Sequence, residues 1–456
     1  MNENISDWFK TNKERINTLK QEFWNNPETA YKEYKCCELT KDFLLENGFT
    51  DVKTVALDLA GKNVEKLPNT VIAKLGSGKP VIGLLGELDA LPGLGQEAVP
   101  YYSPKEGNGQ GCGHCLIATA GVTSAVALKS AMEKENITGT ICYIACPAEE
   151  DLSGKAILAR EGYFDELDFA YMYHPFGRNM RFDKDVWSAI TTMEFNFTGK
   201  SAHAAAMPWD GRSALDAAEL MNVGVQYLRE HVTQDVRIHY VYRNGGMAPN
   251  IVPDKASLYY FIRSREENME DIVKRVEACA EGAATMTGTK AEWHIEGGCH
   301  SYHGNRVLAH TGYDIASAMS AIEYTDEEYE YAAKIQEAQS GKRGTDKDDI
   351  LPRGVDEPDE TEKYDGGSTD VGDLAMKCPT YQFSGFGAAV GLPLHNWSIV
   401  ACVGTDIGLK AAMFAGEAMA QSALEVAKKP EILKAAWEEF HEDYKTPYKC
   451  IIPKDN

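Results

Sequence analysis

The chain has few basic residues for its number of acidic ones. Against 69 Asp and Glu it has 46 Lys and Arg, which gives a formal net charge of -23 at pH 7. This charge repels phosphate backbones and anionic lipids, so we expect neither nucleic acid nor a membrane surface as a partner. No apolar run approaches the roughly 20 residues that span a bilayer. Residues 1–7 are polar and acidic, where a signal peptide would be basic and then apolar.

Paired cysteines and repeated segments are also lacking. The 11 cysteines are odd in number and scattered, and several lie in apolar stretches, as Cys142 and Cys146 do. This distribution suits free thiols, and we therefore expect a cytoplasmic protein. The composition, 43% hydrophobic and 25% charged, is typical of a soluble globular protein. Because 456 residues are too many for one ordinary core, we expect two or three lobes.

The hydrophobic pattern changes along the chain and predicts an inserted domain. Its first part alternates strands and helices, with apolar strands at 70–75, 81–85, 138–146 and 167–173 and a long helix at 116–135. From about residue 189 the pattern becomes strand, helix, strand, strand, helix, which is typical of an α+β unit. We predict an α/β domain with a mixed, mostly parallel sheet flanked by helices, formed by residues 1–187 and 301–456. A ferredoxin-like α+β insert is predicted at 188–300. The acidic stretch 322–365 is expected to be a solvated helix and loop.

Side chains that bind metals follow three of these predicted strands and recur in two loops. In an open α/β sheet, active sites lie outside the carboxyl ends of the strands. The residues concerned are Glu87, Asp89, Cys112, His114, Glu149, Glu150, His174 and His395. Each one alone has an ordinary explanation as a turn, a strand-end histidine or a solvated glutamate, but their coincidence at several strand ends favours a metal site.

The mixture of thiol, imidazole and carboxylate indicates which metals are expected. It suits Zn²⁺, Co²⁺, Mn²⁺ or Ni²⁺ rather than Ca²⁺ or Mg²⁺. Two ions about 3.5–4 Å apart are as compatible with the ligands as one. One carboxylate should remain free to take a proton from water. Because Glu149 and Glu150 cannot point the same way from an extended chain, we expect one to ligate and the other to act as the base.

Six segments together resemble a known enzyme family: GELDALP at 86–92, GCGH at 111–114, PAEE at 147–150, HP at 174–175, GKSAHA at 199–204 and PNIVP at 249–253. The set is similar to the amidohydrolase branch of the di-metal aminoacylase and carboxypeptidase family, which includes hippurate hydrolase and the plant auxin-conjugate hydrolases. Within that branch, GGSTDVGD at 366–373 most resembles the B-subunit type of aminobenzoyl-glutamate hydrolase. The likeness spans nearly the whole chain.

The resemblance implies a role for particular residues. It implies metal ligands at Cys112, His114, Glu150, His174 and His395. Glu149 matches the family's general base, and Asp89 would orient the site from behind the ligands. His203 matches a histidine of the insert that reaches a neighbouring subunit's active site in family members, although it could equally be a surface residue in a turn. Asn250 and Arg263 match insert positions that contact the carboxylate end of the substrate.

These matches imply a metal-dependent amidohydrolase that cleaves N-acyl or N-aroyl amino acids, or dipeptides, with a free carboxylate. They imply two divalent ions per subunit and a lid and dimerisation role for the insert, with a homodimer or a heteromer with a sister subunit. A non-catalytic metal-binding partner subunit is the alternative, and a cysteine hydrolase using Cys112 and His114 is a weaker one. Cys115 and Ile117 depart from the hippurate-hydrolase pattern, which leaves Cys115 as an accessory thiol, an oxidation-sensitive residue or inert packing.

Overall fold

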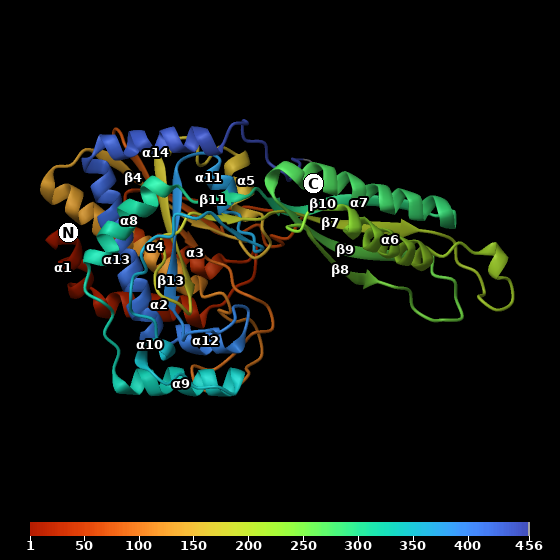
Figure 1. Ribbon diagram of the computed structural model, residues 1–456, viewed down its shortest axis with the longest axis horizontal. Coiled ribbons are helices and arrows are strands. Elements are labelled where there is room, and N and C mark those ends of the chain that lie inside the picture. The colour runs from red at the N-terminus through yellow and green to blue at the C-terminus, as the bar shows by residue number, and fades with distance from the viewer. Residues whose placement is uncertain (455–456) are drawn as a thin grey trace. The chain divides into compact units, whose positions relative to one another are not determined.

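The computed structural model describes residues 1–454 and divides into two compact units (Figure 1). Unit 1 comprises Met1–Asp185, His303–Lys363 and Leu374–Tyr448, and unit 2 comprises Val186–Tyr302, Tyr364–Asp373 and, of the described residues, 449–454. The sequence pattern predicted all of 301–456 in one domain. In the structure, the segments 364–373 and 449–454 are hydrogen-bonded within unit 2. The backbone N–H of Ser188 donates to the carbonyl oxygen of Asp365 at 3.2 Å, and His300 Nε2 lies 2.8 Å from the carbonyl oxygen of Lys449.

Unit 1 is built on a six-stranded sheet of order β1-β2-β4-β3-β5-β13. Its strands are β1 (Asp51–Val55), β2 (Thr70–Ser77), β3 (Val81–Glu87), β4 (Gly139–Cys146), β5 (Phe169–Phe176) and β13 (Thr380–Gly387). β3 pairs in parallel with β4 and β5, and β13 pairs in parallel with β5, whereas β2 is antiparallel to both β1 and β4. Every residue of β3 is buried, as expected of a central strand with both faces covered. The predicted fold class is confirmed.

Helices of unit 1 flank this sheet, some directly and others by packing on helices. They are α1 (Glu3–Thr11), α2 (Lys13–Asn25), α3 (Tyr34–Glu46), α4 (His114–Glu135), α5 (Gly154–Arg160), α8 (Arg306–Ala318), α9 (Asp326–Ser340), α10 (Lys347–Ile350), α12 (Trp397–Val403), α13 (Asp406–Lys428) and α14 (Pro430–Asp443). The helices α3, α4, α8 and α13 contact the sheet directly. Within the acidic stretch, α9 is solvated on one side only, since Tyr329, Ala332 and Ile335 are buried in the core.

The helix α4 is the central helix of unit 1 and packs against β3 and α13 (Figure 1). It packs closely because Gly121 has no side chain: a Cβ there would lie 2.3 Å from the carbonyl oxygen of Leu85. Contrary to the sequence expectation, α4 is long and apolar enough to cross a membrane by length and composition. Its apolar window is 89% buried inside the protein, which is the behaviour of a core helix.

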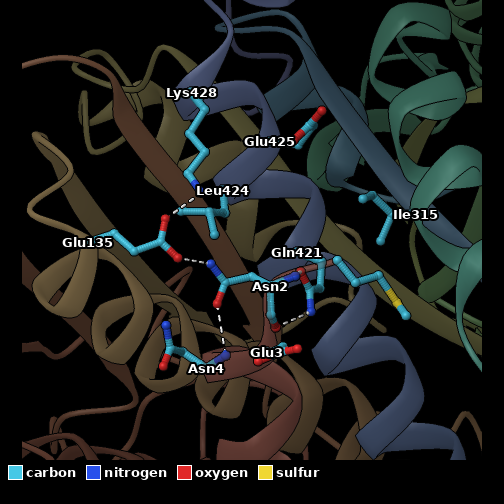
Figure 2. A pocket seen from close by; sticks show the side chains of 10 residues that line it. Asn2, Glu3, Asn4, Glu135, Ile315, Gln421, Leu424, Glu425 and Lys428 are labelled. Atoms are coloured by element: carbon cyan, nitrogen blue, oxygen red, sulfur yellow. Dashed lines mark hydrogen bonds and ion pairs between the residues drawn. The ribbon is translucent and has the colours of Figure 1, made fainter.

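The first residues of the chain lie in a polar crevice between α4 and α13 (Figure 2). The backbone N–H of Asn2 donates to Gln421 Oε1 at 2.7 Å, and Gln421 Nε2 donates back to the carbonyl oxygen of Asn2 at 2.9 Å. Glu135 accepts from the side chains of both Asn2 and Lys428. These hydrogen bonds anchor the first residues to both helices, and the same residues line a crevice of about 410 Å³.

Unit 2 contains a four-stranded antiparallel sheet of order β10-β7-β9-β8. Its elements are β7 (Ala189–Thr198), a 3-10 turn (Pro208–Asp210), α6 (Ala214–Leu228), a second 3-10 turn (Arg229–His231), β8 (Arg237–Asn244), β9 (Lys255–Ser264), α7 (Glu266–Thr287) and β10 (Lys290–Cys299). The two helices α6 and α7 contact each other and the sheet, with a shared apolar core. This βαββαβ order is the predicted ferredoxin-like arrangement, and β8 is an edge strand. Four short elements lie where the chain passes between the units: β6 (Asp185–Trp187), β11 (Tyr302–His303), β12 (Lys363–Asp365) and α11 (Val371–Ala375).

Candidate metal centre

Cys112 and His114 lie in unit 1, where a loop enters α4. Gly113, at φ +81°, makes the turn between them, and α4 begins at His114. Cys112 Sγ lies 3.4 Å from Nε2 of His174, at the end of β5. The imidazole of His114 is fixed from behind, because its Nδ1 lies 3.1 Å from Asp89 Oδ1. Its Nε2 is buried and has no hydrogen-bond partner within residues 1–454, so it is presented to the site.

The two glutamates after β4 occupy a turn and not an extended segment, which corrects the sequence argument about them. Ala148 has φ +54°, and the turn brings both carboxylates toward the same imidazole. The carboxylate oxygens of Glu149 and Glu150 lie 3.7 Å and 3.9 Å from His114 Nε2. The backbone N–H of Glu150 donates to Asp89 Oδ2 at 2.9 Å, so one aspartate orients both the imidazole and this turn.

His395 comes to the site from the loop before α12. Its backbone N–H donates to the carbonyl oxygen of Gly111 at 2.8 Å, which ties this loop to the loop of Cys112. Its Nε2 lies 3.4 Å from Glu150 Oε2. The structure thus brings all the sequence-predicted ligands of unit 1 to one edge of the sheet, at the carboxyl ends of β3, β4 and β5.

The ligand atoms form two groups that share one thiol. Cys112, His114 and His174 form the first group, and Cys112, Glu150 and His395 form the second, with all ligand atoms of a group within 4.8 Å of one another. Two ligands bound to one ion at about 2.0–2.3 Å lie roughly 3–4 Å apart, so the spacings suit coordination. A thiolate common to both groups can bridge two ions.

Burial sets the protonation of these groups in the metal-free protein. It lowers the pKa of His174 to about 4, which leaves the imidazole neutral and able to bind a metal. Burial raises the pKa of Cys112 and also that of Glu150, the latter to about 7, with the neighbouring Asp89 and Glu87 adding to the second shift. Burial alone would lower the pKa of His114, but Asp89 raises it well above its usual value. A raised thiol pKa disfavours Cys112 as a free nucleophile and hence disfavours a cysteine hydrolase.

Glu87 is a residue of this site that the sequence grouped with the candidate metal-binding side chains, but to which the family resemblance assigned no role. It ends β3, its side chain is buried, and its Oε2 lies 3.5 Å from His114 Nε2. Its Oε1 accepts a hydrogen bond of 2.6 Å from Lys155 Nζ, in the first turn of α5. The sequence placed Glu87 at a strand end beside Asp89. It gave no indication of the hydrogen bond with Lys155, which is 68 positions away.

His203 and Asn250 are neighbours in unit 2. The backbone N–H of Ala204 donates to the carbonyl oxygen of Asn250 at 3.0 Å, and His203 forms an isolated bridge with Ile251. His203 has partners in its own segment: its Nδ1 accepts from the backbone N–H groups of Ala205 and Ala206, at 3.2 Å and 3.1 Å. An accepting Nδ1 leaves the proton on Nε2 in the neutral ring, so the exposed imidazole is a hydrogen-bond donor.

Arg263 lies on β9, where its guanidinium donates to Ser368 Oγ at 2.6 Å. Ser368 belongs to the 366–373 segment that carried the sequence resemblance, so this segment lies in unit 2 and contacts Arg263 through Ser368. Cys115, by contrast, points into the core of unit 1 and is 1% exposed. Burial raises the pKa of its thiol to about 12, which favours inert packing over an accessory or oxidation-sensitive role.

Comparison with known sequences finds a matching domain model and relatives that align over most of the chain. Residues 188–285 match the model of the peptidase dimerisation domain of the M20 family. The chain is 35% identical to the B component of the Escherichia coli p-aminobenzoyl-glutamate hydrolase over 99% of its own length and 97% of that protein. It is 29% identical to the Xaa-Arg dipeptidase of Mus musculus, over 94% of the chain and 89% of that enzyme.

A solved structure shares the fold. A dinuclear metal-binding peptidase of the M20 family from Bacillus subtilis superposes with a TM-score of 0.59 and 18% identity, covering 92% of this chain and 99% of that one.

Proposed function

Because this chain belongs to the M20 peptidase family, whose members hydrolyse amide bonds, we propose that it is a metal-dependent amidohydrolase of N-acyl or N-aroyl amino acids or dipeptides. Membership of the family confirms the sequence resemblance. The observation that carries the proposal is the pair of ligand groups that share Cys112, with Glu149 beside them. The alternative of a non-catalytic subunit would require a lost ligand or base, and each of these residues is present.

The residues fit two divalent transition-metal ions. Three buried atoms that face the site, His114 Nε2, Glu150 Oε1 and Glu87 Oε2, have no hydrogen-bond partner in the described chain, as expected of groups that bind a cation. Cys112 adds a soft ligand, which favours Zn²⁺, Mn²⁺, Co²⁺ or Ni²⁺ over Ca²⁺ and Mg²⁺. When bound, such ions acidify a coordinated water and polarise a carbonyl group.

In this proposal each residue has a distinct task. Glu149 accepts the proton of the attacking water and passes it to the amine that leaves. Glu150 remains a ligand, and Asp89 holds both the His114 ring and the Glu150 backbone in place. His203, with its proton on Nε2, donates to the oxyanion that forms at the carbonyl carbon.

Two observations support the substrate class. The indole of Trp397, two residues after His395, packs edge-on against the exposed ring of Tyr102, with centroids 6.0 Å apart. Such a pair beside a metal ligand can stack on an aromatic acyl group. Asn250 and Arg263 would hold the free carboxylate, and the relatives named for an aminobenzoyl-glutamate conjugate and for a dipeptide have substrates of this type.

We further propose that residues 188–300 act as lid and dimerisation domain and that 1–187 and 301–456 form the catalytic domain, with 364–373 and 449–454 packing in unit 2. Unit 2 exposes apolar side chains on α6 and on the edge strand β8: Leu220, Val223, Tyr227, Val241 and Tyr242. An open edge beside an apolar helix face suits pairing with a second copy. A homodimer is proposed, and a heteromer with a sister subunit is the second possibility, because p-aminobenzoyl-glutamate hydrolase has two kinds of subunit. Eleven free cysteines support a cytoplasmic location.

A panel assay tests the activity. The purified protein is supplied with Mn²⁺, Zn²⁺ or Co²⁺ and given N-benzoyl, N-aminobenzoyl and N-acetyl amino acids and dipeptides, with release of the amine as readout. We expect turnover that chelators abolish and Glu149→Gln nearly eliminates. Turnover that survives chelation but is lost on thiol alkylation would instead support a cysteine hydrolase, and no turnover without a sister subunit would support the partner-subunit alternative.

Subunit mixing tests whether His203 acts across a dimer. His203→Ala and Glu149→Gln are each expected to be nearly inactive, but after exchange a mixed dimer contains one site with both residues intact. About half of the dimers are mixed in a random population, so recovery is limited to about a quarter of wild-type sites. If exchange is demonstrated by mass and no activity returns, His203 does not act in trans.

A further inference from the structure

Glu87 and Lys155 form a fully buried ion pair at the edge of the candidate metal centre. Both side chains are essentially inaccessible to solvent, and Lys155 Nζ lies 2.6 Å from Glu87 Oε1. The bond joins the end of β3 to the first turn of α5, which begins shortly after Glu150. The pair therefore holds the carboxylate of Glu87 in place, and it uses only one of the two carboxylate oxygens.

The second oxygen of this carboxylate has no such bond. Glu87 Oε2 is buried without a hydrogen-bond partner in the described chain and faces His114 Nε2 at 3.5 Å. A buried polar atom without a partner is costly, so native proteins rarely leave one unless a water or an ion completes it. The facing nitrogen of His114 likewise has no hydrogen-bond partner in the described chain. In the neutral ring whose Nδ1–H donates to Asp89, which is the form that binds a metal, this nitrogen is an acceptor, and two acceptors cannot satisfy each other.

A cation would satisfy both atoms. Glu87, His114 and Glu149 each offer one ligand atom within 4.8 Å of the other two. A nitrogen and an oxygen bound to one ion at about 2.0–2.2 Å, at a tetrahedral angle, lie roughly 3.4 Å apart. The observed 3.5 Å between Glu87 Oε2 and His114 Nε2 matches this spacing.

We infer that Glu87 is a further metal-binding residue, which takes a ligand position at the ion held by His114 and is aimed there by Lys155. This inference rests on the proposed metal centre but not on the proposed substrate. Lys155 is a positioning residue in this arrangement. It neutralises the carboxylate and, by occupying Oε1, leaves only Oε2 for the ion.

A double-mutant cycle separates this role from that of a merely structural ion pair. Glu87→Gln keeps an acceptor for Lys155 but replaces one oxygen by an amide nitrogen, which does not ligate. Lys155→Met removes the charge and keeps the length, and the double variant leaves neither charge buried alone. The readouts are the unfolding midpoint of the metal-free protein and the Zn²⁺ and Mn²⁺ affinities, measured by competition with a coloured chelator.

We expect Glu87→Gln to weaken the binding of one ion by at least about tenfold. In the double variant the unfolding midpoint should return toward the wild-type value, while the metal affinity stays low. Wild-type affinity and stoichiometry in Glu87→Gln, or an affinity that recovers in the double variant together with stability, would overturn the inference. If Glu87→Gln alone does not fold, the double variant carries the same test.

Cys112→Ala, measured in parallel, distinguishes the failure of this inference from the failure of the metal centre itself. If Cys112→Ala loses metal and Glu87→Gln does not, only the role of Glu87 is wrong. If both variants bind metal as the wild type does, the metal centre is wrong and with it the proposed function.

Discussion

Metal affinity should fall more steeply with decreasing pH below about pH 7 than above it, because Glu150 takes up a proton there. Burial raises the pKa of this carboxyl to about 7 in the metal-free protein, so below that pH an incoming ion must displace a proton from it. Above pH 7 the carboxylate is already free. The pKa values of Cys112 and His114 are also raised, so these groups release protons on metal binding both below and above pH 7. Their contribution to the slope of affinity against pH is therefore the same on both sides of pH 7.

The size of the effect follows from one proton. Between pH 7 and pH 5 the affinity should fall by roughly 100-fold more than the slope above pH 7 would give, or about 2.7 kcal/mol at 1.36 kcal/mol per pH unit. Protonation competes with the ion, so the sign is a loss of affinity as the pH falls.

Competition with a chelator between pH 5.5 and 8.5, corrected for the protonation of the chelator itself, measures the slope. Calorimetry in two buffers of different ionisation enthalpy counts the protons directly. Glu150→Gln is the control: it should bind more weakly at every pH and show no change of slope near pH 7. A wild-type slope that stays constant across pH 7, or a change of slope that persists in Glu150→Gln, refutes the argument.

Three further predictions concern the same unit. Glu149→Gln should reduce kcat by at least about 10²-fold and retain its metal, as expected of a lost base. Glu150→Gln should instead lose metal. Steady-state kinetics and elemental analysis test both variants, and the opposite pattern would reverse the two roles. Cys112→Ala and His174→Ala should each lower the metal content of protein loaded under reducing conditions, and full occupancy in both would contradict the ligand assignment. Gly121→Ala should destabilise the fold by about 1–3 kcal/mol in thermal unfolding, because the added Cβ would lie 2.3 Å from a backbone oxygen of β3. Gly282→Ala in α7 is the control. A Cβ there would have no atom within 4 Å, so this variant should be neutral or slightly stabilising.

The sequence predicted four of the six strands in the sheet of unit 1, but not β1 or β13, and in unit 2 it missed a strand that alternates. The predicted strands 81–85 and 138–146 correspond to β3 and β4, since buried parallel strands are apolar on both faces. The strand β10 (Lys290–Cys299) was not predicted. Its core-facing Ala291, Trp293 and Ile295 alternate with charged or polar residues, so no apolar run marks it. Pairing with β7 makes this segment a strand, and that pairing is tertiary information.

The candidate site was predictable in residue type but not in geometry. The thiol, imidazole and carboxylate side chains at the predicted strand ends and loops were enough to name the candidate ligands of unit 1. The turn at Ala148, which aims both glutamates at His114, depends on a left-handed backbone conformation that alanine gives no reason to expect. The role inferred for Glu87 depends on Lys155, which the packing of α5 against the end of β3 brings to it.

The balance of buried charge explains why this edge of the sheet should bind cations. Glu87, Asp89, Glu149 and Glu150 are all buried or largely buried around His114, and Lys155 is the cation paired with one of them. Carboxylates so crowded cannot all ionise without a further positive charge, and the raised pKa values of Glu150 and His114 are the protein's response in the metal-free state. Divalent ions would supply that charge and release the protons. Metal binding should therefore stabilise the folded state by about 2.7 kcal/mol when the free ion is at 100 times its Kd, and more at higher concentration.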